Sequence, residues 1–162
     1  MLRLFRIKPI NTNKLLDSRL YDERTFYQEF TKDIKQAKQS IIIESPFLTE
    51  RRAAQFCKQF KKLRKKGVRI RVNTRLPYHH DTKLLQVQGW KAAKLLKANG
   101  VKVCFYKDMR HRKLAVVDGH TLWEGSLNIL SQGYSKEIMR RTVSESLSKQ
   151  MLSFTGADRW HW

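Results

Sequence analysis

The chain has 162 residues, of which 41% are hydrophobic and 30% charged, so it can bury the core of one domain and is not of the disordered class. Lysine and arginine total 34 against 14 aspartate and glutamate, which gives a formal net charge of +20 at pH 7. Such an excess repels itself in a compact fold, and a polyanionic partner relieves the repulsion. Nucleic acid is therefore the first candidate partner, and an anionic membrane surface is the second.

The beginning of the sequence, MLRLFRIKPI, lacks the continuous apolar segment of a secretory signal. No later stretch approaches the apolar length that is needed to cross a bilayer. We therefore expect a cytoplasmic protein without a stable membrane anchor.

Residues 1–21 are predicted to form an N-terminal arm or an edge element. The spacing of apolar residues from Phe26 to Ala37 predicts a helix. Strands and helices then alternate, with a strand at 40–45, a helix at 51–66, a strand at 68–74, a helix at 83–99 and a strand at 101–106. Two further strands, around 112–118 and 121–124, are joined by Asp118-Gly119, which is a strong hairpin signal.

A final helix is expected over residues 145–152, before a tail at 154–162 that ends in Trp160 and Trp162 and packs on the body. Alternating strands and helices are typical of a layered α/β domain. We predict an α/β fold with a mixed, partly parallel β-sheet flanked by helices on both faces, in one domain over residues 22–153. Trp90 and Trp123 are expected in its core.

The cysteines and the paired histidines give no pattern of a metal site. Cys57 and Cys104 lie in apolar patterns, with neither a disulfide framework nor a zinc-binding spacing. His79 and His80 follow a proline in a loop, where such a pair is more often a solvated surface feature than two metal ligands.

The residues that could carry chemistry lie between His111 and Asn128, in the sequence HRKLAVVDGHTLWEGSLN. If a strand begins here, His111 and Lys113 share one face at its beginning. Gly125 allows a close backbone approach, and Ser126 and Asn128 add neutral hydrogen-bonding groups. A nucleophile or base, a cation and several donors together make a site for a phosphate.

This segment resembles the motif of the phospholipase D superfamily: HxK, four residues, D, six residues and GSxN. Its fixed places are filled by His111, Lys113, Asp118, Gly125, Ser126 and Asn128. The resemblance implies that His111 attacks phosphorus to give a phosphohistidine. It also implies that Lys113 and Asn128 hold the non-bridging oxygens, with Ser126 as a lesser donor. The residues alone allow this chemistry, because a neutral imidazole is nucleophilic near pH 7 and a lysine stabilises phosphoryl charge.

Two carboxylates belong to the same comparison. In the superfamily a carboxylate beyond GSxN orients the histidine by accepting its other N–H, and Glu137 falls at about the right distance. The alternative is that Glu137 is a helix-start or surface residue. Asp118 is expected to be mainly structural, capping the Asp-Gly turn or tying down the motif, with proton transfer as the minority option.

The chain contains one such motif, whereas catalysis in the superfamily uses two histidines, one as nucleophile and one as general acid. The resemblance therefore implies a homodimer with one active site across the two-fold axis. Two histidines and two lysines can supply what a metal would, so we expect metal-independent catalysis without a cofactor.

The superfamily includes lipid hydrolases, phosphatidyl transferases and nucleases, and motif chemistry does not choose among them. Clustered positive charge favours nucleic acid, with DNA ahead of RNA. The residues expected to bind it are Arg51, Arg52, Lys62, Lys65, Arg75, Arg110 and Arg112. For any one of them the alternative is a solvated surface position.

A nuclease, of endonuclease type, is therefore the leading expectation. The alternatives are a phospholipid phosphodiesterase at an anionic membrane and a non-catalytic nucleic-acid-binding module. The stretch LWEGSLNILSQGYSKEIMRR is also similar to phospholipase D-like domains attached to some helicases. That similarity implies a helicase or another DNA-processing protein as a possible partner.

Overall fold

The computed structural model describes residues 17–157, so most of the predicted arm and the tryptophans at 160 and 162 lie outside the described residues. The described elements are, in chain order, β1 (Asp17–Asp22), α1 (Phe26–Gln36), β2 (Ser40–Glu44), α2 (Glu50–Lys65), β3 (Arg69–Arg75), η1 (Pro77–His79), α3 (Lys83–Ala98), β4 (Lys102–Tyr106), β5 (Leu114–Val117), β6 (Thr121–Gly125), β7 (Ile138–Val143) and α4 (Glu145–Thr155). The last helix thus continues to Thr155, beyond its predicted end at 152.

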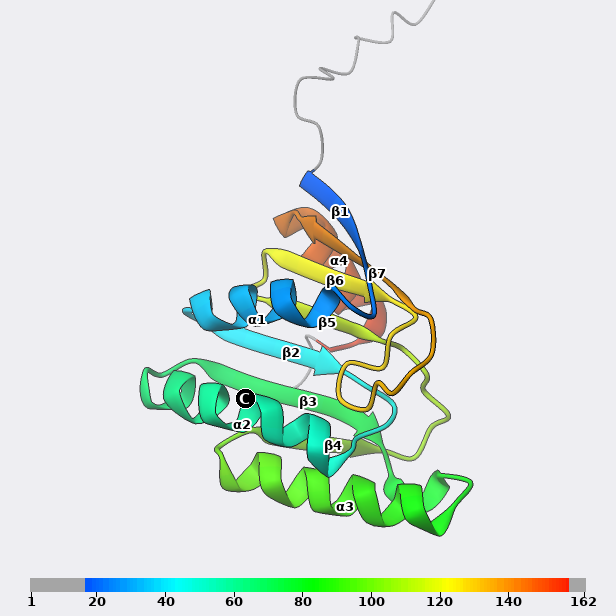
Figure 1. Cartoon of the computed structure of the whole chain (residues 1–162). Helices are drawn as coiled ribbons and strands as arrows, with labels where there is room; N and C mark the ends of the chain where they lie inside the picture. The colour runs from blue at the N-terminus through cyan, green and yellow to red at the C-terminus, as the bar shows by residue number, and fades with distance from the viewer. Residues whose placement is uncertain (1–16, 158–162) are drawn as a thin grey trace, which may run out of the picture.

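The described strands form one seven-stranded sheet in the order β1-β7-β6-β5-β2-β3-β4. Strands β2, β3 and β4 are parallel, and every other neighbouring pair is antiparallel. Helices α1, α2 and α3 cover one face of the sheet, and α4 lies on the other (Figure 1). The prediction of a mixed, partly parallel sheet with helices on both faces is therefore confirmed.

The core forms between the sheet and the three-helix layer. Helix α1 buries Phe26, Phe30 and Ile34 at helical spacing, because these residues share one face. Trp123 of β6 is fully buried against them, with ring centroids 5.1 Å from Phe26 and 5.7 Å from Phe30. Its indole N–H donates to Asp33 at 2.7 Å, which satisfies the one polar group that a buried tryptophan carries. The predicted core position of Trp123 is confirmed.

The predicted hairpin is present as the antiparallel pair β5–β6. Asp118 and Gly119 both have positive φ, at 54° and 63°, as a two-residue turn of the primed type requires. The Asp118 carboxylate accepts hydrogen bonds from the backbone N–H groups of Lys38, Gln39 and Ser40 at 2.8, 2.8 and 2.9 Å. It therefore fastens the hairpin to the segment that enters β2.

Two local predictions are wrong, and one strand was missed. Strand β5 begins at Leu114, so His111 and Lys113 precede it instead of standing on its face. Strand β7 was not predicted, because arginines interrupt its apolar pattern and only Met139 and Thr142 are buried. Trp90 is 37% exposed, because the core positions of α3 are taken by the small residues Ala92 and Ala93 and by Leu96.

We predict that Asp118→Ala lowers the free energy of unfolding by roughly 2–4 kcal/mol, because it removes three charge-assisted hydrogen bonds and leaves alanine in a left-handed conformation. Urea denaturation monitored by circular dichroism measures this loss. Asp118→Asn is the matched control, because asparagine tolerates the backbone conformation and keeps one acceptor oxygen, so its loss should be smaller. Equal, negligible losses in the two variants would contradict the fastening role.

Candidate active site

One edge of the sheet collects residues from every part of the chain. Because β5 runs antiparallel to β2, with Leu114 opposite Glu44, the start of β5 lies beside the carboxyl ends of the parallel strands. The end of β6 and the start of β7 meet at the same edge, since Gly125 pairs with Met139. In Figure 1 this edge is marked by the arrowheads of β2 and β3. The carboxyl ends of parallel strands are where α/β sheets generally place their sites.

Five of the predicted catalytic residues lie along this edge. His111 and Lys113 come directly before β5, Ser126 and Asn128 follow β6, and Glu137 directly precedes β7. Gly125 permits the close approach of the two segments, because a Cβ at this position would clash with the carbonyl oxygen of Ile138. Gly125 of the motif is thus needed for the ends of β6 and β7 to pack together, whatever its role in catalysis.

Ser126 and Asn128 hold different places in the site. The Ser126 hydroxyl accepts from the backbone N–H of Ile138 at 3.1 Å, and the Ser126 N–H donates to the Ile138 carbonyl at 2.9 Å. These bonds tie the start of β7 to the end of β6. The side-chain oxygen of Asn128 is buried and has no hydrogen-bond partner among the described residues.

His111 and Lys113 form a close pair. The Lys113 Nζ lies 2.6 Å from Nδ1 and 3.3 Å from Nε2 of His111, and donates to the His111 carbonyl at 2.7 Å. Partial burial lowers the pKa of His111, and the positive charges of Lys113 and Arg75 lower it further. Burial also lowers the pKa of Lys113. The imidazole therefore stays neutral, and hence nucleophilic, to a lower pH than usual.

Glu137 lies beside this pair without bonding to the imidazole. Its carboxylate accepts from the Ser135 hydroxyl at 2.8 Å, and its negative charge opposes the fall in the pKa of Lys113. The bond to His111 that the resemblance implies is not among the hydrogen bonds of residues 17–157. Asp118 lies at the opposite end of β5, about 13 Å along the strand, and so is not brought to the site.

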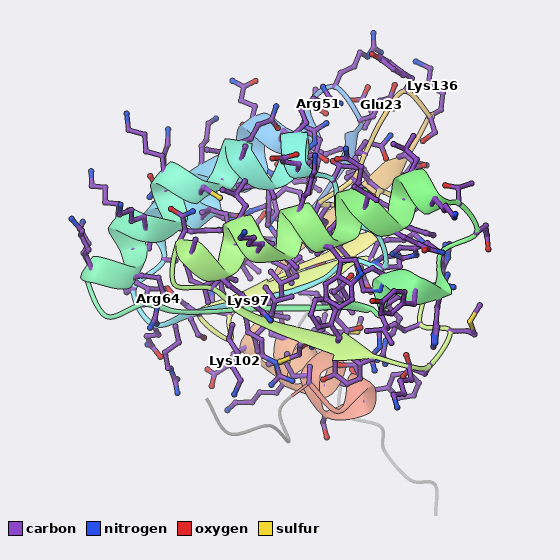
Figure 2. The ribbon with its side chains drawn as sticks, turned by 90° about the horizontal axis from the view of Figure 1, so that it is seen from below. Glu23, Arg51, Arg64, Lys97, Lys102 and Lys136 are labelled. Atoms are coloured by element: carbon purple, nitrogen blue, oxygen red, sulfur yellow. The ribbon has the colours of Figure 1, made fainter. Side chains whose placement is uncertain are left out.

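Four of the predicted nucleic-acid-binding residues lie on α2, and they do not all face the site. Arg51 is exposed at the end of α2 that points to the site edge, whereas Lys62 and Lys65 are exposed about 16 Å or more along the helix, toward the end where Figure 2 labels Arg64. Arg52 is turned inward: it is 9% exposed, lies over the Tyr27 ring at 3.8 Å and donates to the Gln132 carbonyl at 3.0 Å. Its contacts are those of a residue that supports the fold.

Arg110 and Arg112 both pair with a buried carboxylate that the sequence does not single out; the Arg110 side chain is 10% exposed, whereas that of Arg112 is 34% exposed. Glu44, at the end of β2, has a side chain that is 2% exposed and lies 3.3 Å from Arg110 Nη1 and 2.7 Å from Arg112 Nε. Arg110 also pairs with Asp108 at 2.7 Å and lies over the Tyr106 ring at 3.2 Å. Glu44 thus holds both residues that flank His111 in sequence.

Arg75, at the end of β3, is the remaining predicted residue. It is 6% exposed, and it donates to the His79 carbonyl at 2.6 Å. The positive charge of Arg75 lowers the pKa of His111.

Among residues 17–157 no group of three or more His, Cys, Asp and Glu side chains is placed to hold a metal ion.

We predict that Glu44→Gln lowers the free energy of unfolding by about 3 kcal/mol, because it leaves the two flanking arginines without their buried counter-charge. The matched control is Glu145→Gln, which breaks a solvent-exposed i,i+4 pair with Lys149 and should cost less than about 1 kcal/mol. Urea denaturation of both variants measures the difference. Equal effects would show that Glu44 does not hold the His111 segment.

We predict that Arg75→Met raises the pKa of His111, because the variant removes one of the positive charges that disfavour the imidazolium. Proton NMR titration of the His111 ring measures the change directly. Arg75→Lys keeps the charge and should leave the pKa close to that of the parent protein. A His111 pKa that is unchanged in the methionine variant would exclude electrostatic coupling across the site.

The chain is similar in sequence to one known protein family. Residues 30–155 match the family described as "Cardiolipin synthase, PLD-like domain". A comparison with curated protein sequences finds no match. No described helix has both the length and the apolar character to cross a membrane.

Several solved structures share the fold. Nuc from Salmonella typhimurium, a phospholipase D family member, superposes with a TM-score of 0.70 at 17% identity, over 86% of this chain and 91% of Nuc. NucT from Helicobacter pylori gives 0.67 at 18% identity, over 86% of this chain and 93% of NucT. Phosphatidylserine synthase from Haemophilus influenzae Rd KW20 gives 0.62 at 13% identity, over 90% of this chain but 38% of the synthase.

The family match covers most of the sequence, the fold is similar to that of a solved family member, and five of the six predicted catalytic residues lie along one edge of the sheet. The chain belongs to the phospholipase D-like family.

Proposed function

We propose that the protein is a metal-independent nuclease that hydrolyses DNA through a phosphohistidine intermediate, in an active site shared by two copies of the chain. The observation that supports it most directly is the His111–Lys113 pair, which lies at the same edge of the sheet as Ser126 and Asn128, on a protein of net charge +20. A neutral imidazole next to a cation is what attack on an anionic phosphodiester requires.

Lys113 has a second role in this mechanism. In the structure its ammonium lies against both ring nitrogens of His111. A phosphate that enters the site offers stronger, charged acceptors for the ammonium, so Lys113 turns to a non-bridging oxygen and frees a ring nitrogen. That nitrogen attacks phosphorus, the N–P bond forms and the P–O bond to the leaving strand breaks.

The leaving oxygen needs a proton, and a second imidazole is the natural source. The His80 ring contacts the Phe47 ring, with centroids 4.8 Å apart, and the Phe47 ring also contacts His111, but His80 is only 5% exposed. In the proposed homodimer the His111 of the second copy is protonated beside the anionic phosphate, and this imidazolium gives a proton to the leaving oxygen and becomes neutral. The same imidazole then takes a proton from water, which attacks phosphorus and breaks the N–P bond.

An apolar surface next to the site supports the homodimer. Leu20 and Ile138 are each 59% exposed and Phe154 is 87% exposed, on the face of the sheet that α4 only partly covers. These side chains line a cavity of about 620 Å³ together with Lys113 and Ser126. Covering this surface with a second copy would remove apolar area from water and bring a second motif to the site.

Charge, and not the fold, favours DNA over lipid as the substrate. Solved structures with this fold include phosphatidylserine synthase and TrmBL2, an archaeal chromatin protein whose structure shows a mode of DNA binding. The fold therefore serves both substrate classes. An excess of 20 positive charges suits a polyphosphate backbone, whose counterions are released on binding. The exposed apolar side chains beside the site, Leu20, Ile138 and Phe154, could instead contact lipid, so phospholipid hydrolysis is the second candidate function.

We predict that the protein cleaves DNA in excess EDTA and that His111→Ala lowers the rate at least about a thousand-fold, because the nucleophile is lost. His120→Ala is the matched control, since His120 is exposed at the hairpin turn on the opposite edge. A phosphatidylcholine assay runs in parallel. Cleavage of lipid without cleavage of DNA would overturn the nuclease proposal, and full activity of the His111 variant would overturn the mechanism.

The proposed sharing of the site between two copies is tested separately, with the same purified protein. Sedimentation at micromolar concentration should show a dimer, and Phe154→Glu should shift it toward monomer and lower activity together, because it places a charge in the apolar surface. A fully active monomer would contradict a site shared between copies.

A further inference from the structure

Next to the candidate site, on the opposite side from the cavity, lies a second exposed apolar surface. It is formed by η1 and the first half of α3, where Tyr78 is 68% exposed, Leu84 69%, Val87 49% and Trp90 37%. The rings of Tyr78 and Trp90 lie edge to face with centroids 5.4 Å apart, and Trp90 packs on Phe105 at 5.0 Å. The aromatic rings are therefore held in place while one of them remains open to solvent.

We infer that Tyr78 and Trp90 form a stacking platform for unpaired bases, so that the nuclease acts on single-stranded or frayed DNA. This inference rests on the proposed function, because it assigns a substrate form to the same site.

The position of the platform is fixed relative to His111. Arg75 donates through one nitrogen to the His79 carbonyl at 2.6 Å and to the Met109 sulfur at 3.5 Å, which joins η1 to the loop that carries His111. On the other side the Phe47 ring lies 4.8 Å from His80 and 5.9 Å from His111. His80 is thus buried as a spacer between the platform segment and the site, and not solvated as the sequence analysis expected.

The charge around the platform suits a nucleotide strand. Lys83, Lys91, Lys94 and Lys107 are exposed on or next to α3 and β4. The nearby exposed acids are Asp81, Glu50 and Asp108, of which Glu50 lies 4.0 Å from Lys91 and Asp108 pairs with Arg110 at 2.7 Å. A protein partner of ordinary charge could use the apolar side chains but not the excess of lysines. Bases on exposed rings with phosphates on neighbouring cations satisfy both.

The chemistry of stacking selects the strand form. In a duplex the faces of the bases are covered by their neighbours, so a protein ring outside the helix cannot reach them. An unpaired base exposes its face, and stacking on a protein ring is worth about 1–3 kcal/mol per base for any base type. A platform joined to the His111 loop through Arg75 and Phe47 can therefore hold an unpaired base of a strand whose phosphate is in the site.

The test is binding of labelled 12-nucleotide single strands and of the matching duplex to His111→Ala protein at fixed ionic strength, so that no cleavage occurs. Tyr78→Ala should weaken single-strand binding about 5- to 150-fold and leave duplex binding within about twofold. Tyr78→Phe, which keeps the ring, should bind like the parent. Single strands should also quench the fluorescence of Trp90 in a protein where the other tryptophans are phenylalanine.

Leu84→Ala is the matched control, because Leu84 is as exposed as Tyr78 but has no ring. Equal losses in the leucine and tyrosine variants would show a general apolar docking surface and overturn the platform. An unchanged affinity in Tyr78→Ala, or equal losses for single strands and duplex, would overturn it too. If Tyr78-dependent binding is found but no cleavage occurs in the parent protein, the platform stands and the nuclease proposal fails.

Discussion

The antiparallel pairing of β5 with β2 is the constraint on which the site depends. It reverses the direction of the chain at the centre of the sheet, so the loop before β5 meets the carboxyl ends of β2, β3 and β4. His111 thereby comes to lie near Glu44 and Arg75, which are far from it in sequence. A parallel pairing at this position would place His111 at the opposite edge, and the motif would have neither its buried counter-charge nor its neighbouring cation.

The basic side chains of the protein are of two kinds: some are held in contacts within the fold, and others are exposed to solvent. Arg110 and Arg112 pair with the buried Glu44, and Arg52 packs on Tyr27. The exposed lysines of α2 and α3 keep theirs in solvent, where a polyanion can reach them. Net charge therefore indicates the class of partner, whereas burial decides which cations are available to it.

What the sequence could predict depended on whether a signal was local. Local patterns were enough to predict helix α1, the parallel strands and the Asp118-Gly119 turn, because each has its own periodicity or turn chemistry. The candidate catalytic residues were found from the spacing of the motif. Strand β7 gains its stability from partners on both sides, so its own pattern was too weak to predict it. The partner of Arg110 and Arg112 could not be found either, because Glu44 is 66 and 68 residues away and reads as part of an apolar strand. Both Trp90 and Trp123 lie among apolar residues in the sequence, so both were expected in the core. Only the packing of α3 shows that Trp90 is partly exposed.

The central claim is that an imidazole of the protein, and not water, attacks the phosphodiester first. Cleavage of an oligonucleotide with one chiral phosphorothioate in ¹⁸O-labelled water tests this most directly, since each in-line displacement inverts the configuration at phosphorus. Two displacements through a phosphohistidine predict a product with retained configuration. A product with inverted configuration would mean a single attack by water and would contradict the account.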